Sequence, residues 1–192
     1  MAADSRSLLT GVILAGGLAR RMGGVAKGLQ HYAGRPLLAH AIERLQPQVA
    51  TLLLNVNHDQ AAYAGFALPL VGDRFGDYPG PLAGLHAGLC AASTPWVLSV
   101  PCDSPHFPAD LAGHLLAATL AGGQPLAYAR AGGKAHPVFC LCRRELADDL
   151  AAYLDQGGRR VMQWCEQAGG IGIDFPDPAA FANCNSVDDL AP

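Results

Sequence analysis

The chain has 192 residues, a formal net charge of -3 at pH 7 and a charged fraction of 15%. This length suits one domain, which buries roughly 70% of the surface of its unfolded chain and needs no stabilising disulfide or structural metal. The mildly acidic balance argues against a general nucleic-acid surface. The lack of an 18-residue apolar stretch argues against a membrane-spanning helix.

Six cysteines occur without a Cys-x-x-Cys pair or a Cys/His spacing typical of zinc sites, which favours reduced thiols in the cytosol. The first residues lack the basic segment and long apolar core of a signal peptide. We therefore expect a soluble, cytoplasmic protein. A single domain is expected over residues 1–192, with residues 1–7 as a flexible N-terminal extension.

Short apolar runs alternate with segments of helical periodicity, which predicts an α/β fold with a mostly parallel central sheet. Strands are expected over residues 8–14, 51–56, 68–71, 96–100, 126–129, 137–141 and 171–173. Helices are expected over residues 36–45, 81–89, 111–120, 144–154 and 159–168, with Pro36 at the first position of the first helix. Gly132 and Gly133 join two strands as a hairpin would, so the sheet is expected to mix strand directions.

A glycine-rich loop follows the first expected strand and runs to Lys27. It contains Gly16, Gly17, Gly23 and Gly24 together with Arg20 and Arg21. Glycines let backbone N–H groups approach an anion closely, and the basic side chains supply matching charge. The order around Lys27 is not that of a P-loop, and the glycine spacing does not fit Gly-x-Gly-x-x-Gly. We interpret the loop as a cradle for a polyphosphate ligand; the alternative is a solvated basic loop.

Polar residues follow each of the first four expected strands. They are the glycine loop, Asn55 with Asn57, Asp73, and Asp103. In an open α/β sheet, ligands bind beyond the carboxyl ends of the strands, so these residues are expected to meet at one edge. Asn55 and Asp73 could recognise a base or a ribose, or could serve as ordinary strand-end and turn residues, and Asn57 is expected to be structural.

Asp103 lies between Pro101 and Pro105, which stiffen the turn that presents its carboxylate. A fixed carboxylate at a phosphate site predicts Mg²⁺, which needs only one or two carboxylates besides water and phosphate oxygens. The alternative is a turn aspartate that accepts from nearby backbone amides. A second glycine loop around Gly80 begins a helix, where a further anionic group or a tight turn could lie.

No Ser/His/Asp order, paired carboxylates or Cys/His dyad points to a covalent enzyme intermediate, whereas phosphoryl-type transfer needs mainly alignment and charge stabilisation. The whole set of motifs resembles the molybdenum cofactor guanylyltransferases, a family of nucleotidyltransferases with a Rossmann-like fold. The resemblance runs nearly end to end. The motifs that carry it are Leu14-Ala15-Gly16-Gly17, Arg21-Met22-Gly23-Gly24, Lys27, Asn55, Asp73, Tyr78-Pro79-Gly80-Pro81-Leu82-Ala83-Gly84, Pro101-Cys102-Asp103-Ser104-Pro105, His136-Pro137, Arg159-Arg160-Val161-Met162 and Asn183-Cys184-Asn185-Ser186.

The resemblance implies transfer of GMP from GTP to the phosphate of molybdenum-molybdopterin, with release of pyrophosphate. It implies catalytic roles for Arg21, Lys27 and Asp103, with Asp103 as the Mg²⁺ ligand. It places GTP at Leu14, Ala15, Gly16, Gly17, Lys27, Asn55, Asp73 and Asp103. The pterin side is expected towards Gly80, Gly84, Arg159, Asn183 and Asn185. Family partners are the molybdenum insertion enzyme and apo-molybdoenzymes or their chaperones, with no nucleic acid and no membrane.

The same comparison of motifs shows one departure from the family pattern and leaves three rival functions. Ser186 stands where threonine is more usual, which keeps the hydroxyl. A molybdopterin cytidylyltransferase usually has Leu-Ala-Ala-Gly, whereas Gly16 and Gly17 are adjacent here. A sugar-phosphate nucleotidyltransferase is usually longer. A non-catalytic carrier of the nucleotide or the pterin cofactor would keep the glycine loop but could lose Asp103.

Overall fold

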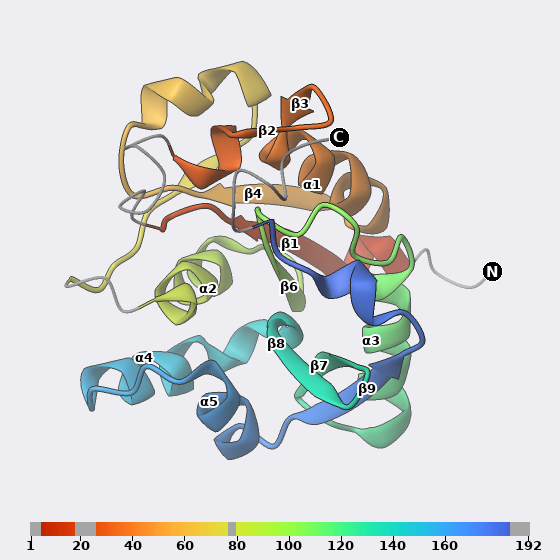
Figure 1. Cartoon of the computed structure of the whole chain (residues 1–192). Coiled ribbons are helices and arrows are strands. Elements are labelled where there is room, and N and C mark those ends of the chain that lie inside the picture. The colour runs from red at the N-terminus through yellow and green to blue at the C-terminus, as the bar shows by residue number, and fades with distance from the viewer. Residues whose placement is uncertain (1–4, 18–25, 77–79, 185–192) are drawn as a thin grey trace.

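The computed structural model describes residues 5–17, 26–76 and 80–184 (Figure 1). Its main sheet contains β1 (Leu9–Leu14), β4 (Thr51–Asn55), β5 (Leu70–Val71), β6 (Trp96–Pro101), β7 (Leu126–Ala131), β8 (Lys134–Arg143) and β9 (Ile171–Phe175) in the order β5-β4-β1-β6-β8-β7-β9. Neighbouring strands pair in parallel except on the two sides of β8, which is antiparallel to β6 and to β7. The sheet is therefore mixed but mostly parallel.

Helices cover both faces of this sheet (Figure 1). One face carries α1 (Leu37–Leu45) and α3 (Leu111–Gly122), and the other carries α2 (Pro81–Ala91), α4 (Ala147–Asp155) and α5 (Val161–Gln167). Short 3-10 helices are η1 (Ser5–Leu8), η2 (Lys27–Leu29), η3 (Gln46–Gln48), η4 (Gln60–Phe66), η5 (Arg144–Leu146) and η6 (Pro178–Phe181). A small hairpin of β2 (His31–Tyr32) and β3 (Arg35–Pro36) precedes α1.

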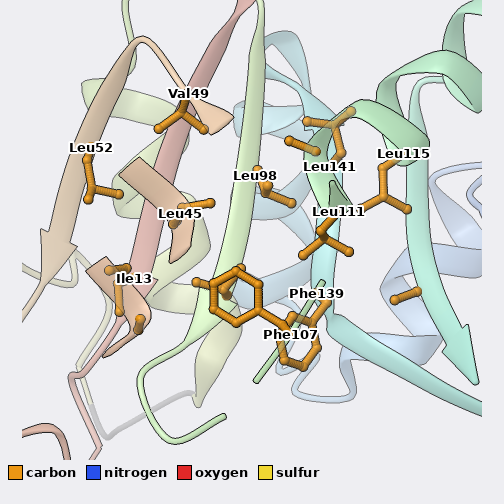
Figure 2. Close-up of a cluster of buried hydrophobic side chains, with 14 of the residues drawn as sticks. Ile13, Leu45, Val49, Leu52, Leu98, Phe107, Leu111, Leu115, Phe139 and Leu141 are labelled. Carbon is orange, nitrogen blue, oxygen red and sulfur yellow. The ribbon is translucent and has the colours of Figure 1, made fainter. Parts of the chain in front are cut away.

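Alternation along the central strands produces the two halves of the core. In β6, Leu98 and Val100 join the core under α1 and α3, whereas Val97 faces the opposite helices. Figure 2 shows the first half, in which Leu98 packs among side chains from α1, α3 and β8. Burial on both faces explains why the sequence of this strand is a continuous apolar run and not an alternating one.

The expected fold class is confirmed, and all seven expected strands are present within a few residues of their predicted bounds. Pro36 was predicted as the first residue of the first helix, which places the start of the helix one residue too early. It ends β3 in an extended conformation and precedes Leu37, where α1 begins. The segment after β8 begins as η5 before α4 starts at Ala147, and α5 begins at Val161. The predicted Gly132-Gly133 hairpin joins β7 to β8.

The first described residues contact the rest of the domain. Within the predicted flexible extension of residues 1–7, Arg6 donates a hydrogen bond to the carbonyl of Val49 at 3.4 Å, and η1 begins at Ser5. Flexibility of residues 1–7 stays a prediction. Over the residues that the structure describes, no helix is both long and apolar enough to cross a membrane.

Candidate active site

A cavity of about 630 Å³ opens at the edge of the sheet where β1, β4, β5 and β6 end. Because β8 runs against these strands, its first residues lie at the same edge and contribute a further wall. The predicted site residues that line the cavity are Leu14, Ala15, Gly16, Gly17, Lys27, Asn55, Asp73, Gly80, Asp103 and Asn183. The convergence of the four strand ends, which the sequence predicts, is therefore present in the structure.

Asp103 follows β6 at the centre of this edge and forms an ion pair with Lys27, whose Nζ contacts Asp103 Oδ2. The Asp103 backbone is also fixed, since its carbonyl accepts a hydrogen bond from Cys184 N at 2.8 Å. The second carboxylate oxygen, Oδ1, is buried, and no described group donates a hydrogen bond to it. A buried carboxylate oxygen without a donor is costly in an apolar setting and is suited to a cation.

Asp73 is held by two asparagines from the end of β4. Asn55 Nδ2 donates to Asp73 Oδ1 at 2.8 Å, and Asn57 Nδ2 donates to Asp73 Oδ2 at 2.7 Å. Asn57 Oδ1 in turn accepts from Asp73 N at 2.9 Å. The carboxylate is thereby fixed at both oxygens before any ligand binds. Asn57 thus has a structural role, as expected: it holds Asp73, which lines the cavity.

Two glycines allow Asn55 to occupy its buried position, where it is 3% exposed. A Cβ at Gly84 would lie 2.4 Å from Asn55 Oδ1, and a Cβ at Gly16 would lie 2.8 Å from the same atom. Both distances are shorter than real Cβ contacts. Gly80, which precedes α2, has a φ of +79°, a left-handed conformation that glycine adopts without strain. Gly84 thus lies beneath Asn55, whereas Gly80 lines the cavity.

The wall from β8 comprises residues 135–139, and the C-terminal segment after β9 completes it. His136 stacks on Phe181 of η6, with ring centroids 4.9 Å apart and an interplanar angle of 23°. Burial, reinforced by the charge of Lys134, lowers the pKa of His136 below 6.5. Asn183 accepts a hydrogen bond at its Oδ1 from Ser104 Oγ at 2.7 Å, which ties this segment to the Asp103 turn.

A protein-family model described as the MobA-like NTP transferase domain matches residues 11–169. A molybdenum cofactor guanylyltransferase from Ralstonia nicotianae is 46% identical to this chain over 191 residues, which cover 95% of this chain and 94% of that relative. A relative from Methylibium petroleiphilum has the same name and is 46% identical over 190 residues, which cover 95% of this chain and 93% of that relative. The chain belongs to the molybdenum cofactor guanylyltransferase family. It is a nucleotidyltransferase enzyme, which argues against the non-catalytic carrier.

Solved structures share the fold of this guanylyltransferase family member. A molybdopterin-guanine dinucleotide biosynthesis protein A from Archaeoglobus fulgidus has a TM-score of 0.74, 20% identity and 94% coverage of both chains. A CMP:2-keto-3-deoxy-manno-octonic acid synthetase, solved in complex with CTP, has a TM-score of 0.73 and 16% identity, and the match covers 95% of this chain and 93% of that one. At these identities the likeness concerns the fold alone.

Membership of a nucleotidyltransferase family suggests a dependence on a divalent metal. The residues of the guanylyltransferase cavity fit such an ion, because Asp103 Oδ1 is buried without a donor among the described residues. Over the same part of the chain, no group of three or more His, Cys, Asp or Glu side chains could hold a metal. A single protein carboxylate is sufficient where water and phosphate oxygens complete the coordination.

The remaining predicted site residues are not brought together by the described structure. Arg21 and Asn185 lie outside the described residues. Arg159 is not part of the cavity lining, and its Nη1 donates to the carbonyls of Leu154 at 2.9 Å and Gly158 at 2.7 Å. Their roles, like the division of the cavity between substrates, stay predictions.

Cys102 lines the guanylyltransferase cavity, although it was not predicted as a site residue. Burial, followed by the nearby charge of Asp103, raises the pKa of its thiol to about 12. Its backbone N–H donates to the carbonyl of Leu14 at 3.2 Å, which links the Asp103 turn to the glycine loop. Cys102 is therefore a neutral packing residue at neutral pH and no nucleophile.

Proposed function

We propose that the protein transfers GMP from GTP to the terminal phosphate of molybdenum-molybdopterin, forming the guanine dinucleotide cofactor and releasing pyrophosphate. Relatives named molybdenum cofactor guanylyltransferase match 95% of the chain at 43–46% identity, which supports this reaction. The observation that carries the choice of base is the fixed carboxylate of Asp73 in the same cavity as Lys27 and Asp103.

The hydrogen bonds around Asp73 favour guanine over cytosine and adenine. Asn55 uses its two amide hydrogens on Asp73 Oδ1 and on the carbonyl of Val71 at 3.2 Å. Asn57 donates its two amide hydrogens to Asp73 Oδ2 and to the carbonyl of Gly16 at 3.3 Å. The group left for the base is therefore a carboxylate, which only accepts. Guanine presents two neighbouring donors, N1–H and the 2-amino group, whereas cytosine and adenine present a donor beside an acceptor.

The chemical step is an in-line substitution at the α-phosphorus of GTP. An oxygen of the acceptor phosphate forms the new P–O bond, and the bond between the α-phosphorus and the bridging oxygen breaks, so pyrophosphate leaves with the electron pair. Lys27 contributes positive charge beside Asp103, and Arg21 is proposed to do the same from the glycine loop. Asp103 would hold Mg²⁺, which when bound offsets negative charge on the α-phosphate and on pyrophosphate.

The acceptor would occupy the side of the cavity away from Asp73. Of the residues predicted to bind it, Gly80 and Asn183 line the cavity, whereas Gly84 supports Asn55 beside Asp73. We further propose a cytoplasmic location, with the molybdenum insertion enzyme supplying the acceptor and apo-molybdoenzymes or their chaperones receiving the product. These partners are what the resemblance to the family implies.

A comparison of four nucleotides tests the reaction. Purified protein, Mg²⁺ and molybdate-loaded molybdopterin are incubated with GTP, CTP, ATP or UTP, and pyrophosphate and dinucleotide mass are measured. A guanine dinucleotide from GTP alone is expected. A cytosine product would overturn the assignment of Asp73 and indicate a cytidylyltransferase. Activity with a sugar phosphate in place of the pterin acceptor would overturn the assigned acceptor.

A further inference from the structure

The His136–Phe181 stack is a rigid aromatic surface in the cavity wall. Phe181 packs edge-on against Phe139 at 5.0 Å and 85°, and against Phe175 at 5.4 Å and 63°. Phe181 is 2% exposed. His136 is half-buried and lines the cavity, with one ring face covered by Phe181. The imidazole is therefore held in place on one face by a buried ring, and His136 is part of the cavity lining.

The position of this surface separates it from the nucleotide. The sheet order places β8 on one side of β6, and places β1, β4 and β5 on the other side. Asp103 follows β6, so it stands between the wall of His136 and the carboxylate of Asp73. Strands lie about 4.8 Å apart, so four strand spacings from β5 to β8 span about 19 Å. That width suits a nucleotide on one side of Asp103 and a second flat ring system on the other.

We propose that His136, supported by Phe181, is the surface on which the pterin ring system of the acceptor stacks. This inference rests on the proposed function and extends it to the acceptor side. A flat heteroaromatic ring gains most from stacking on another ring that is already immobilised, because little side-chain freedom is lost on binding.

Groups near His136 suit the polar edge, the neutral ring and the phosphate of a pterin acceptor. Asn183 Oδ1 accepts from Ser104 Oγ, so the polar hydrogens of its amide group are the donors suited to a pterin carbonyl. The pKa of His136 is lowered by burial and by Lys134, so its ring is mostly neutral at pH 7.5. A neutral ring favours a neutral aromatic partner over the phosphate. The nearby charged pair of Lys27 and Asp103 marks where the acceptor phosphate would lie.

Three substitutions distinguish stacking from hydrogen bonding. His136→Ala removes the ring, His136→Phe keeps a flat ring without nitrogen atoms, and His136→Gln keeps polar atoms without a ring. We expect the KM for molybdenum-molybdopterin to rise about tenfold or more in the Ala and Gln variants and to stay within about threefold in the Phe variant. The KM for GTP should not change. Gln163→Ala, at an exposed position of α5 outside the cavity lining, is the control.

A second readout does not need turnover. The fluorescence of 6-hydroxymethylpterin phosphate, an oxidised pterin, should be quenched by the wild-type protein and by His136→Phe, and not by His136→Ala. Quenching that survives in His136→Ala, or an acceptor KM restored by Gln and not by Phe, would overturn the stacking role. A wild-type protein that quenches the pterin but makes no guanine dinucleotide would contradict the proposed function while supporting the stack.

Discussion

Hydrogen bonds hold Asp73 on the proposed nucleotide side of the cavity, whereas aromatic packing holds His136 on the opposite side. Asp73 is fixed by three hydrogen bonds of 2.7–2.9 Å with the side chains of Asn55 and Asn57. His136 is fixed by one stacked ring, which is in turn packed by two further phenylalanines. The first arrangement can discriminate between bases by donors and acceptors. The second selects for a flat shape.

The direction of the strands explains this difference. The nucleotide side is built at the carboxyl ends of parallel strands, where the chain leaves the sheet through polar turns. The opposite side is built from the beginning of the antiparallel strand β8, where the residues are still part of a strand and still packed. Asp103 stands at the boundary, where the parallel strand β6 meets β8.

Asp103→Asn removes the negative charge at this boundary. We expect it to have the largest effect on turnover. Turnover should fall on the order of a hundredfold or more, because the cation loses its carboxylate, while the fold is kept because little packing changes. Steady-state kinetics at saturating Mg²⁺ and a thermal unfolding curve measure the two quantities. Asp110→Asn, at an exposed position before α3, is the control and should behave as the wild type. Near-normal turnover of Asp103→Asn would refute its role.

Asn57→Ala tests whether the hydrogen bonds on the nucleotide side fix Asp73. The change removes the donor to Asp73 Oδ2 and the acceptor for Asp73 N. Hydrogen bonds to charged groups contribute about 1.5–3 kcal/mol, so the KM for GTP should rise about 10- to 100-fold with a smaller change in kcat. Discrimination between GTP and ITP, which lacks the 2-amino group, should weaken as well.

The matched control lies on the other side of the cavity. Asn183→Ala should raise the KM for the pterin acceptor and leave the KM for GTP unchanged, since Asn183 contacts the Asp103 turn and not Asp73. If both asparagine variants changed the GTP and acceptor constants alike, the division of the cavity into two sides would be wrong.

The sequence predicts the elements of this site better than the contacts within it. Buried strands such as β6 are apolar on both faces and so stand out as continuous runs, and the residues after them are then known to share an edge. The two-residue strands β2 and β3 have no such run, and Pro36 could equally begin a helix or end a strand. That Asn57 holds Asp73 depends on side-chain directions at the ends of two different strands.

The wall of His136 could not be predicted for a different reason. Gly132 and Gly133 indicate a hairpin, but they do not say which of its strands lies beside β6. Only that neighbour relation brings residues 135–139 to the cavity. The stack on Phe181 needs in addition the return of the C-terminal segment, which the hydrogen bond from Cys184 N to the Asp103 carbonyl fixes.

Two glycine substitutions in helices give the smallest and sharpest comparison. Gly84→Ala places a Cβ 2.4 Å from Asn55 Oδ1 and 2.8 Å from Leu14 Cδ2, whereas Gly113→Ala in α3 meets nothing within 4 Å. Urea unfolding should show Gly84→Ala to be less stable by about 1–3 kcal/mol through overpacking, and Gly113→Ala to be more stable by about 1 kcal/mol through helix propensity.

GTP affinity should fall only in Gly84→Ala, because displacing Asn55 releases Asp73 from one of its two amide donors. Equal stability of the two variants would mean that α2 can shift away from β4 without cost. Loss of stability in Gly84→Ala with unchanged GTP affinity would show that Asn57 alone is enough to hold the carboxylate. The hydrogen bonds around Asp73 would then tolerate the loss of one donor, just as the aromatic stack is expected to tolerate His136→Phe.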